Sequence, residues 1–78
     1  MLIEVRQSHI RCGEPRSYTR CPIALALSPY LGETPFVVDC DQVCLQGAKR
    51  KLHLPRSAQR FIALFDEGKP VKPFRFRL

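Results

Sequence analysis

The side chains best suited to chemistry in this chain are its cysteines and histidines, which can ligate metal ions or act as nucleophiles. They are Cys12, Cys21, Cys40, Cys44, His9 and His53. Zinc knuckles usually contain two pairs of cysteines, each pair about two to four residues apart, and here only the cysteine pair Cys40 and Cys44 has such a spacing. The pattern favours cysteines that fill small apolar spaces. We therefore predict no metal ligands and keep a zinc-stabilised interaction module as an alternative.

Cys21 is the strongest candidate for a catalytic nucleophile. Pro22 suits the first position of a helix, and a thiol at a helix N-terminus would have a lowered pKa. No catalytic motif surrounds Cys21, and the four glycines indicate turns rather than a phosphate-binding loop. The acidic pairs at 39–41 and 66–67 indicate a turn and a helix end. The sequence predicts no catalytic residue, no cofactor and a protein that is not an enzyme.

Positive charge is concentrated in the second half of the chain. The 78 residues carry 13 Lys and Arg against 7 Asp and Glu, a net charge of +6. Residues 1–47 hold four basic and five acidic residues, net −1, whereas residues 48–78 hold nine basic and two acidic residues, net +7. Such a basic half is typical of proteins that bind an anionic partner, either nucleic acid or an acidic protein face.

We expect the partner-binding surface to consist of basic side chains from this half. The predicted contact residues are Lys49, Arg50, Lys51, Arg56, Arg60, Arg75 and Arg77. Strand alternation places Arg75 and Arg77 on one face of the last strand and Phe74 and Phe76 on the other face. A sheet covered by helices on one face would therefore show both arginines on its bare face, together with Arg6, Lys51 and His53.

Three interpretations of this basic surface remain open at the level of sequence. The charges can simply keep an exposed sheet face hydrated, dock an acidic protein, or bind nucleic acid. Nucleic-acid binding also needs exposed aromatic side chains for stacking, and only Tyr18 and Tyr30 are candidates outside the apolar patterns.

Two helices and five strands are expected to position these side chains. The apolar run 21–27 predicts a buried helix that begins at Pro22 and ends near Ser28, because Pro29 disfavours a helical conformation in the residue before it. A second, amphipathic helix ends before Gly68. Alternation predicts strands at 2–6, 35–39, 42–46, 51–54 and 71–78, and a single helical turn is predicted at 7–12.

The predicted fold is α+β: a single two-layer domain over residues 1–78, with the order β-α-β-β-β-α-β. We expect one small mixed or antiparallel sheet with both helices on one face. The sequence lacks a run of about 18 apolar residues, so no membrane helix is predicted. The alternating N-terminus does not resemble a signal peptide, so we expect a cytoplasmic protein with free thiols.

Three segments resemble a family of small phage and prophage proteins. The matching patterns are CPIALAL at 21–27, LP at 54–55 followed by FIxxFDxG at 61–68, and PFxFxL at 73–78. The resemblance implies a location in the bacterial host cell and an action by binding a host machine such as a polymerase, a nuclease or a CRISPR effector. Arg75 and Arg77 replace the acidic residues of that family's last strand.

The resemblance and the charge together predict a function. We expect a phage-type protein that binds and modulates or inhibits a host protein or nucleoprotein complex with an acidic surface. An anti-defence inhibitor is the sharper form of this hypothesis. The alternative is a nucleic-acid-binding accessory protein that uses the basic sheet face.

Overall fold

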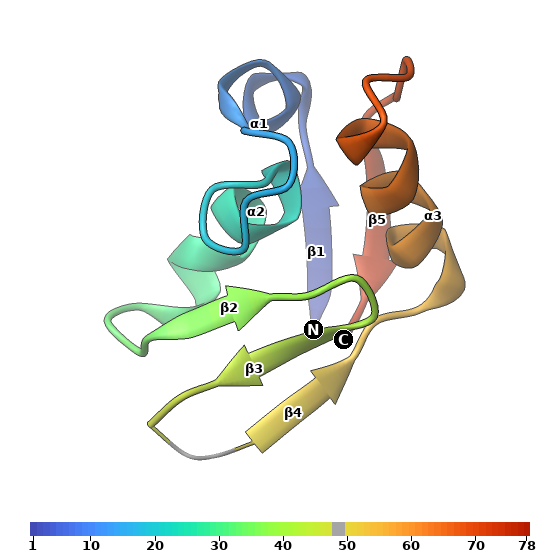
Figure 1. Ribbon diagram of the computed structural model, residues 1–78. Coiled ribbons are helices and arrows are strands. Elements are labelled where there is room, and N and C mark those ends of the chain that lie inside the picture. The colour runs from blue at the N-terminus through green and yellow to red at the C-terminus, as the bar shows by residue number, and fades with distance from the viewer. Residues whose placement is uncertain (48–49) are drawn as a thin grey trace.

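The computed structural model describes residues 1–47 and 50–78 (Figure 1). Its elements, in chain order, are β1 (Leu2–Val5), α1 (Gln7–Cys12), α2 (Pro22–Leu31), β2 (Phe36–Val38), β3 (Gln42–Leu45), β4 (Arg50–His53), α3 (Arg56–Asp66) and β5 (Phe74–Arg77). The α+β class and the predicted order of the main elements are confirmed, and the predicted turn at 7–12 forms the short helix α1. Within those residues, none of the helices has the length and apolar character needed to cross a bilayer.

The strands form two antiparallel sheets, so the expectation of one sheet was wrong. One sheet pairs β1 with β5, and the other has the order β2-β3-β4. On the outer edge of β2, the backbone N–H of Val38 donates to the carbonyl oxygen of Tyr18 at 2.7 Å. The loop between α1 and α2, and not a strand, therefore bonds to this edge.

Helices α2 and α3 lie on the same side of the β1–β5 sheet (Figure 1). Ile23 and Leu27 of α2 are fully buried in the core. They share this cluster with Ile3 of β1, Phe76 of β5 and Val43 of β3. The apolar run at the start of α2 is thus buried, as predicted, and its core cluster includes residues of both sheets.

Helix α2 runs one turn beyond the predicted end at Ser28 and contains Pro29. The cost of this proline is limited because it stands near the exposed C-terminal end, where only one intrahelical hydrogen bond is lost. The N–H of Gly32 still donates to the carbonyl oxygen of Ser28 at 3.1 Å. Gly32 then ends the helix with a φ of 58°, which favours glycine.

The long loop between α1 and α2 is fixed to the end of α3. The backbone N–H of Arg16 donates to Oδ1 of Asp66 at 2.8 Å, and Nη1 of Arg16 donates to the carbonyl oxygen of Asp66 at 3.2 Å. Within the loop, Oγ of Ser17 accepts from the N–H of Arg20. With the bond from Val38 to Tyr18, this loop therefore connects α3 to the meander β2–β4.

Candidate functional site

The structure places the predicted contact residues on three separate elements. Arg50 and Lys51 lie on β4, Arg56 and Arg60 on α3, and Arg75 and Arg77 on β5. Lys49 lies outside the described residues. All six described side chains are exposed, and none forms an ion pair with another residue of the described ranges, where the pairs are Arg6–Glu4, Arg20–Glu14 and Lys69–Glu67.

A single basic sheet face does not form, and this prediction is corrected. Lys51 and His53 belong to the three-stranded sheet, whereas Arg75 and Arg77 belong to the β1–β5 sheet, and the two sets of strands run in different directions (Figure 1). The register also places Glu4 directly opposite Arg75. The bare face of the β1–β5 sheet therefore carries both signs of charge.

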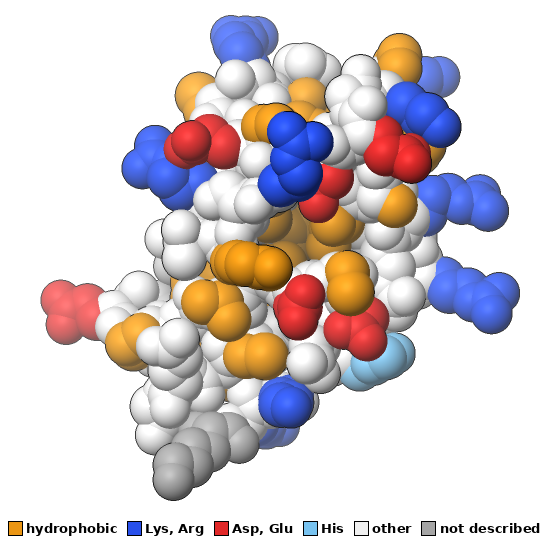
Figure 2. Space-filling view, viewed as in Figure 1, with side chains coloured by type: hydrophobic (Ala, Val, Ile, Leu, Met, Phe, Trp, Pro, Cys, Tyr) orange, Lys and Arg blue, Asp and Glu red, His pale blue; other side chains and the backbone are white. Residues whose placement is uncertain are grey.

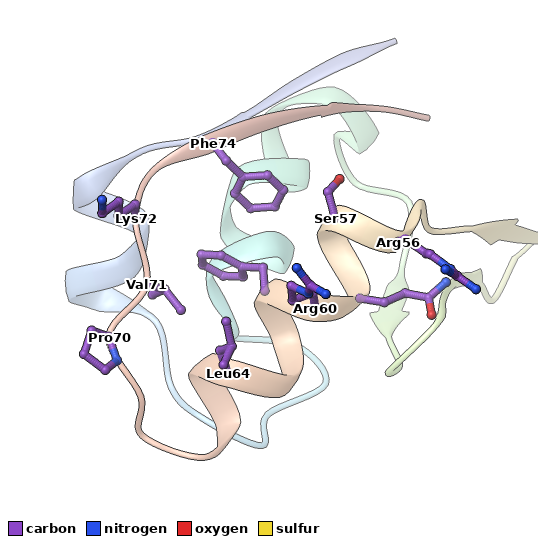
Figure 3. A pocket seen from close by; sticks show the side chains of 10 residues that line it. Arg56, Ser57, Arg60, Leu64, Pro70, Val71, Lys72 and Phe74 are labelled. Atoms are coloured by element: carbon purple, nitrogen blue, oxygen red, sulfur yellow. The ribbon is translucent and has the colours of Figure 1, made fainter.

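Part of the predicted set instead lies beside an open groove between α3 and the segment that leads into β5. The groove has a volume of about 1000 Å³. It combines cationic side chains with apolar ones and has no acidic residue in its lining. The residues that define this basic groove are Arg56, Arg60, Lys72, Phe61, Leu64, Val71 and Phe74 (Figure 3).

Local sequence explains how the groove forms. Arg56 and Arg60 are four residues apart on α3, so they lie on the same face of the helix. Gly68 has a φ of 76°, which ends the helical path and turns the chain back. The segment that carries Val71 and Lys72 therefore returns alongside the helix it has just left.

The apolar floor of the groove continues into the aromatic core. The rings of Phe61 and Phe74 are stacked, with centroids 4.8 Å apart, and the centroids of Phe74 and Phe76 are 5.6 Å apart. Phe61 is buried, whereas Leu64 and Phe74 are only partly covered. In Figure 3, Leu64 from α3 and Phe74 from β5 point toward the space between these segments.

Sequence reasoning did not include Lys72, Leu64 and Val71 in the predicted site. Pro70 and Pro73 bracket Val71 and Lys72, which indicates a stiff extended segment. Nothing in that pattern shows that the segment folds back against α3. Only the tertiary structure brings Lys72 to the same groove as Arg56 and Arg60.

A second hollow of about 270 Å³ lies among the 16–18 loop, the start of α2 and the β2–β3 turn. Figure 2 shows an apolar hollow near the centre of this face with acidic side chains beside it. Its lining includes Cys21, Cys40, Asp39 and Asp66. This hollow differs from the basic groove because its charged lining is mainly acidic.

Cys21 is a capping thiol at this hollow. Its side chain is 4% exposed, and Sγ accepts a hydrogen bond from the N–H of Ala24 at 3.4 Å. Burial raises the pKa of the Cys21 thiol, and the negative charge of Asp66 adds to that rise, although the N–H groups of Ala24 and Ile23 act in the opposite direction. The arrangement keeps the thiol protonated at neutral pH, so it does not supply an activated nucleophile.

No three His, Cys, Asp or Glu side chains come together as a metal-binding group in the described ranges. The chain matches no protein-family model, no curated protein and no solved structure. The candidate functional site is the basic groove, whose cations surround an apolar floor and form no ion pair within the described part of the chain.

Proposed function

We propose that this protein works by binding, and that it modulates or inhibits a host protein or nucleoprotein complex that presents an acidic surface. In this proposal it is a phage-type protein of the bacterial cytoplasm, and inhibition of a defence complex is its sharpest form. The observation that carries the proposal is the basic groove. Arg56, Arg60 and Lys72 border an apolar floor that has no acidic residue in its lining.

Physical chemistry favours a protein partner at such a groove. Arginine is enriched at protein interfaces because its guanidinium can bind a carboxylate through two parallel hydrogen bonds while its stem packs on apolar surface. Leu64 and Phe74 offer partly exposed apolar surface for a partner's side chain. Binding here would block the acidic surface of the partner from its usual contacts.

The aromatic side chains argue against nucleic acid as the main ligand of the groove. Phe74 stacks on Phe61 and Phe76, so its ring faces are used within the protein. Tyr18 is 62% exposed, but it lines the second hollow, the one of about 270 Å³, together with Asp39 and Asp66. Carboxylates at that position would repel phosphate groups.

One observation favours nucleic acid as a second candidate. Arg75 and Arg77 are exposed and lie on the same face of β5, about 7 Å apart along the strand. Such a pair can contact neighbouring phosphates. Glu4 opposite Arg75 weakens this positive field.

Charge reversal in the groove tests the proposal. Wild-type protein and the variant Arg56→Glu/Arg60→Glu are used as bait in a bacterial lysate. We expect the wild type to capture an acidic host protein and the groove variant to lose it. The variant Arg50→Glu/Lys51→Glu has the same change of net charge on β4 and should retain the partner. Equal loss in both variants would mean that capture follows net charge and not the groove.

A gel shift with random DNA and RNA separates the two candidate functions. We expect no shift at low salt. A shift whose affinity falls steeply as salt rises, and which disappears in Arg75→Glu/Arg77→Glu, would instead support nucleic-acid binding.

A further inference from the structure

The outer edge of β5 has no strand partner among the described residues, since this strand pairs only with β1. The terminal residues show which backbone groups point toward β1. The N-terminal ammonium of Met1 donates to the carbonyl oxygen of Leu78 at 3.0 Å, and the N–H of Leu78 donates to the carbonyl oxygen of Met1 at 2.9 Å. Met1 and Leu78 therefore form a hydrogen-bonded pair.

In an antiparallel ladder, hydrogen-bonded pairs alternate with non-hydrogen-bonded pairs. Because Leu78 is in a hydrogen-bonded pair, Phe76 and Phe74 are in such pairs too, and their backbone N–H and C=O groups point toward β1. The N–H and C=O groups of Arg75 and Arg77 consequently point away from β1, along the outer edge of the sheet. Among the described residues, the backbone groups of Arg75 and Arg77 form no hydrogen bond with loops or turns.

This outer edge borders the basic groove. Phe74 is both the first residue of β5 and part of the groove lining, whereas no residue of β1 lines the groove. Phe74 and Phe76 face the helices, and Arg75 and Arg77 face the other side of the sheet. A strand added at this edge would thus have one set of side chains over the groove and the other set beside the two arginines.

We propose that the outer edge of β5 binds an extended segment of a protein partner as an added strand, in which apolar and acidic side chains alternate. This inference rests on the proposed function and specifies how the acidic partner docks. The apolar side chains enter the groove against Leu64 and Val71. The carboxylates lie beside Arg75 and Arg77, while the backbone groups of these two residues form the ladder bonds.

Charge disfavours a second copy of this chain as the occupant. A β5 strand paired with another β5 would bring the arginines of both chains to one side of the new ladder. Like charges across neighbouring strands are destabilising. Between β5 and an acidic strand this repulsion is replaced by attraction. The edge therefore favours an acidic partner over a second copy of the chain.

Two short peptides of identical composition test the alternation. The first, Glu-Leu-Glu-Val-Glu-Leu-Glu, alternates, and the second, Glu-Glu-Leu-Val-Leu-Glu-Glu, has the same residues in blocks. We expect the alternating peptide to bind about tenfold more tightly by fluorescence anisotropy, because only it can direct every apolar side chain to one face. Its binding should also slow hydrogen exchange at the amides of Arg75 and Arg77.

A proline substitution isolates the backbone contribution. Arg75→Pro removes the outward N–H and leaves the bonds to β1 in place, since proline is tolerated at a sheet edge. Arg75→Ala removes the same charge but keeps the N–H, so it is the matched control. We expect the alternating peptide to bind about tenfold more weakly to Arg75→Pro than to Arg75→Ala, with both variants showing a folded circular dichroism spectrum.

The outcomes separate this inference from the proposed function. Equal affinity for the two peptides, with both lost in Arg56→Glu/Arg60→Glu, would overturn strand addition while acidic binding stands. Unchanged exchange at Arg75 and Arg77 in the presence of saturating peptide would overturn it as well. Binding of single-stranded DNA with no binding of either peptide would overturn both proposals.

Discussion

At the scale of single residues, burial decides what each side chain can do. Cys21 has the helix-terminal position that activates thiols elsewhere, but it is covered by the core and lies near Asp66. Its sulfur therefore caps α2 and stays protonated. Asp66 also has a structural role, because its carboxylate accepts a hydrogen bond from the backbone N–H of Arg16. Sequence position made Cys21 a candidate nucleophile and placed Asp66 at a helix end, and in the structure both residues stabilise the fold.

The surroundings of the His9 side chain predict that the free energy of unfolding depends on pH. Its Nδ1 accepts the backbone N–H of Arg6 at 2.9 Å at the start of α1. Burial lowers the pKa of His9 from 6.5, and the positive charge of Arg6 lowers it further. The unfolded chain therefore binds this proton more tightly than the folded chain.

The direction of the effect follows from linkage. The contribution of His9 to the free energy of unfolding is complete above about pH 6.5 and is lost as the pH falls from there toward its lowered folded pKa. Urea unfolding at a series of pH values should show this decline in the wild type. His9→Gln keeps an acceptor at this position but does not titrate, so its curve should be flatter. Parallel curves would contradict the assignment.

At the scale of elements, the two prolines of α2 have opposite roles. Pro22 is buried in the first turn, where a missing N–H costs nothing. Pro29 is exposed in the last turn, where an N–H could still reach the carbonyl oxygen of Leu25. The same substitution should therefore have opposite effects at these positions.

We expect Pro29→Ala to raise the free energy of unfolding by about 1 kcal/mol, because it restores a helical hydrogen bond. Pro22→Ala should lower it by about 1 kcal/mol, since it removes buried apolar atoms and a residue preset for the helix start. Thermal or urea unfolding of both variants measures the pair. Destabilisation by both substitutions would show that the loss of unfolded-state rigidity, and not helix geometry, dominates.

The elements were predictable where one local signal decides the structure. Alternation fixed β5, and helical spacing of Ala58, Phe61 and Ile62 fixed the buried face of α3. The groove was not predictable, because it depends on the return of the segment with Val71 and Lys72 onto α3. That return is a contact between elements, and no local periodicity records it.

At the scale of the whole molecule, the split into two sheets determines where the charge lies. The predicted basic face required β4 and β5 to share a sheet, but β5 pairs with β1 and β4 pairs with β3. Individual arginines were placed correctly as exposed residues, whereas their grouping depended on strand pairing. That pairing joins segments far apart in the sequence, and no local pattern in the sequence records it.

Removal of residues 74–78 should abolish cooperative folding. These residues include Phe76, which is 4% exposed, and they pair with the strand that carries the buried Ile3 and Val5. The loss of one large core side chain costs about 3–5 kcal/mol, a large part of the stability expected for a small domain. Circular dichroism during urea unfolding should show a broad, early transition.

The full-length variant Arg75→Ala/Arg77→Ala is the control for this truncation. It removes two exposed side chains of β5 but keeps the strand and its core residues. We expect it to unfold cooperatively, near the wild-type denaturant midpoint. A sharp transition in the truncated chain would show that the rest of the core is sufficient without β5.

The pairing of β1 with β5 also sets an order of events during translation. Met1 and Leu78 are hydrogen-bonded although they are 77 positions apart in the sequence. β1 therefore leaves the ribosome before β5 and stays without its partner until β5 has been made, and contacts of such sequence separation form slowly. Because Phe74 belongs to both β5 and the basic groove, a nascent chain has no groove. The groove can therefore form only after β5 has been synthesised and has paired with β1.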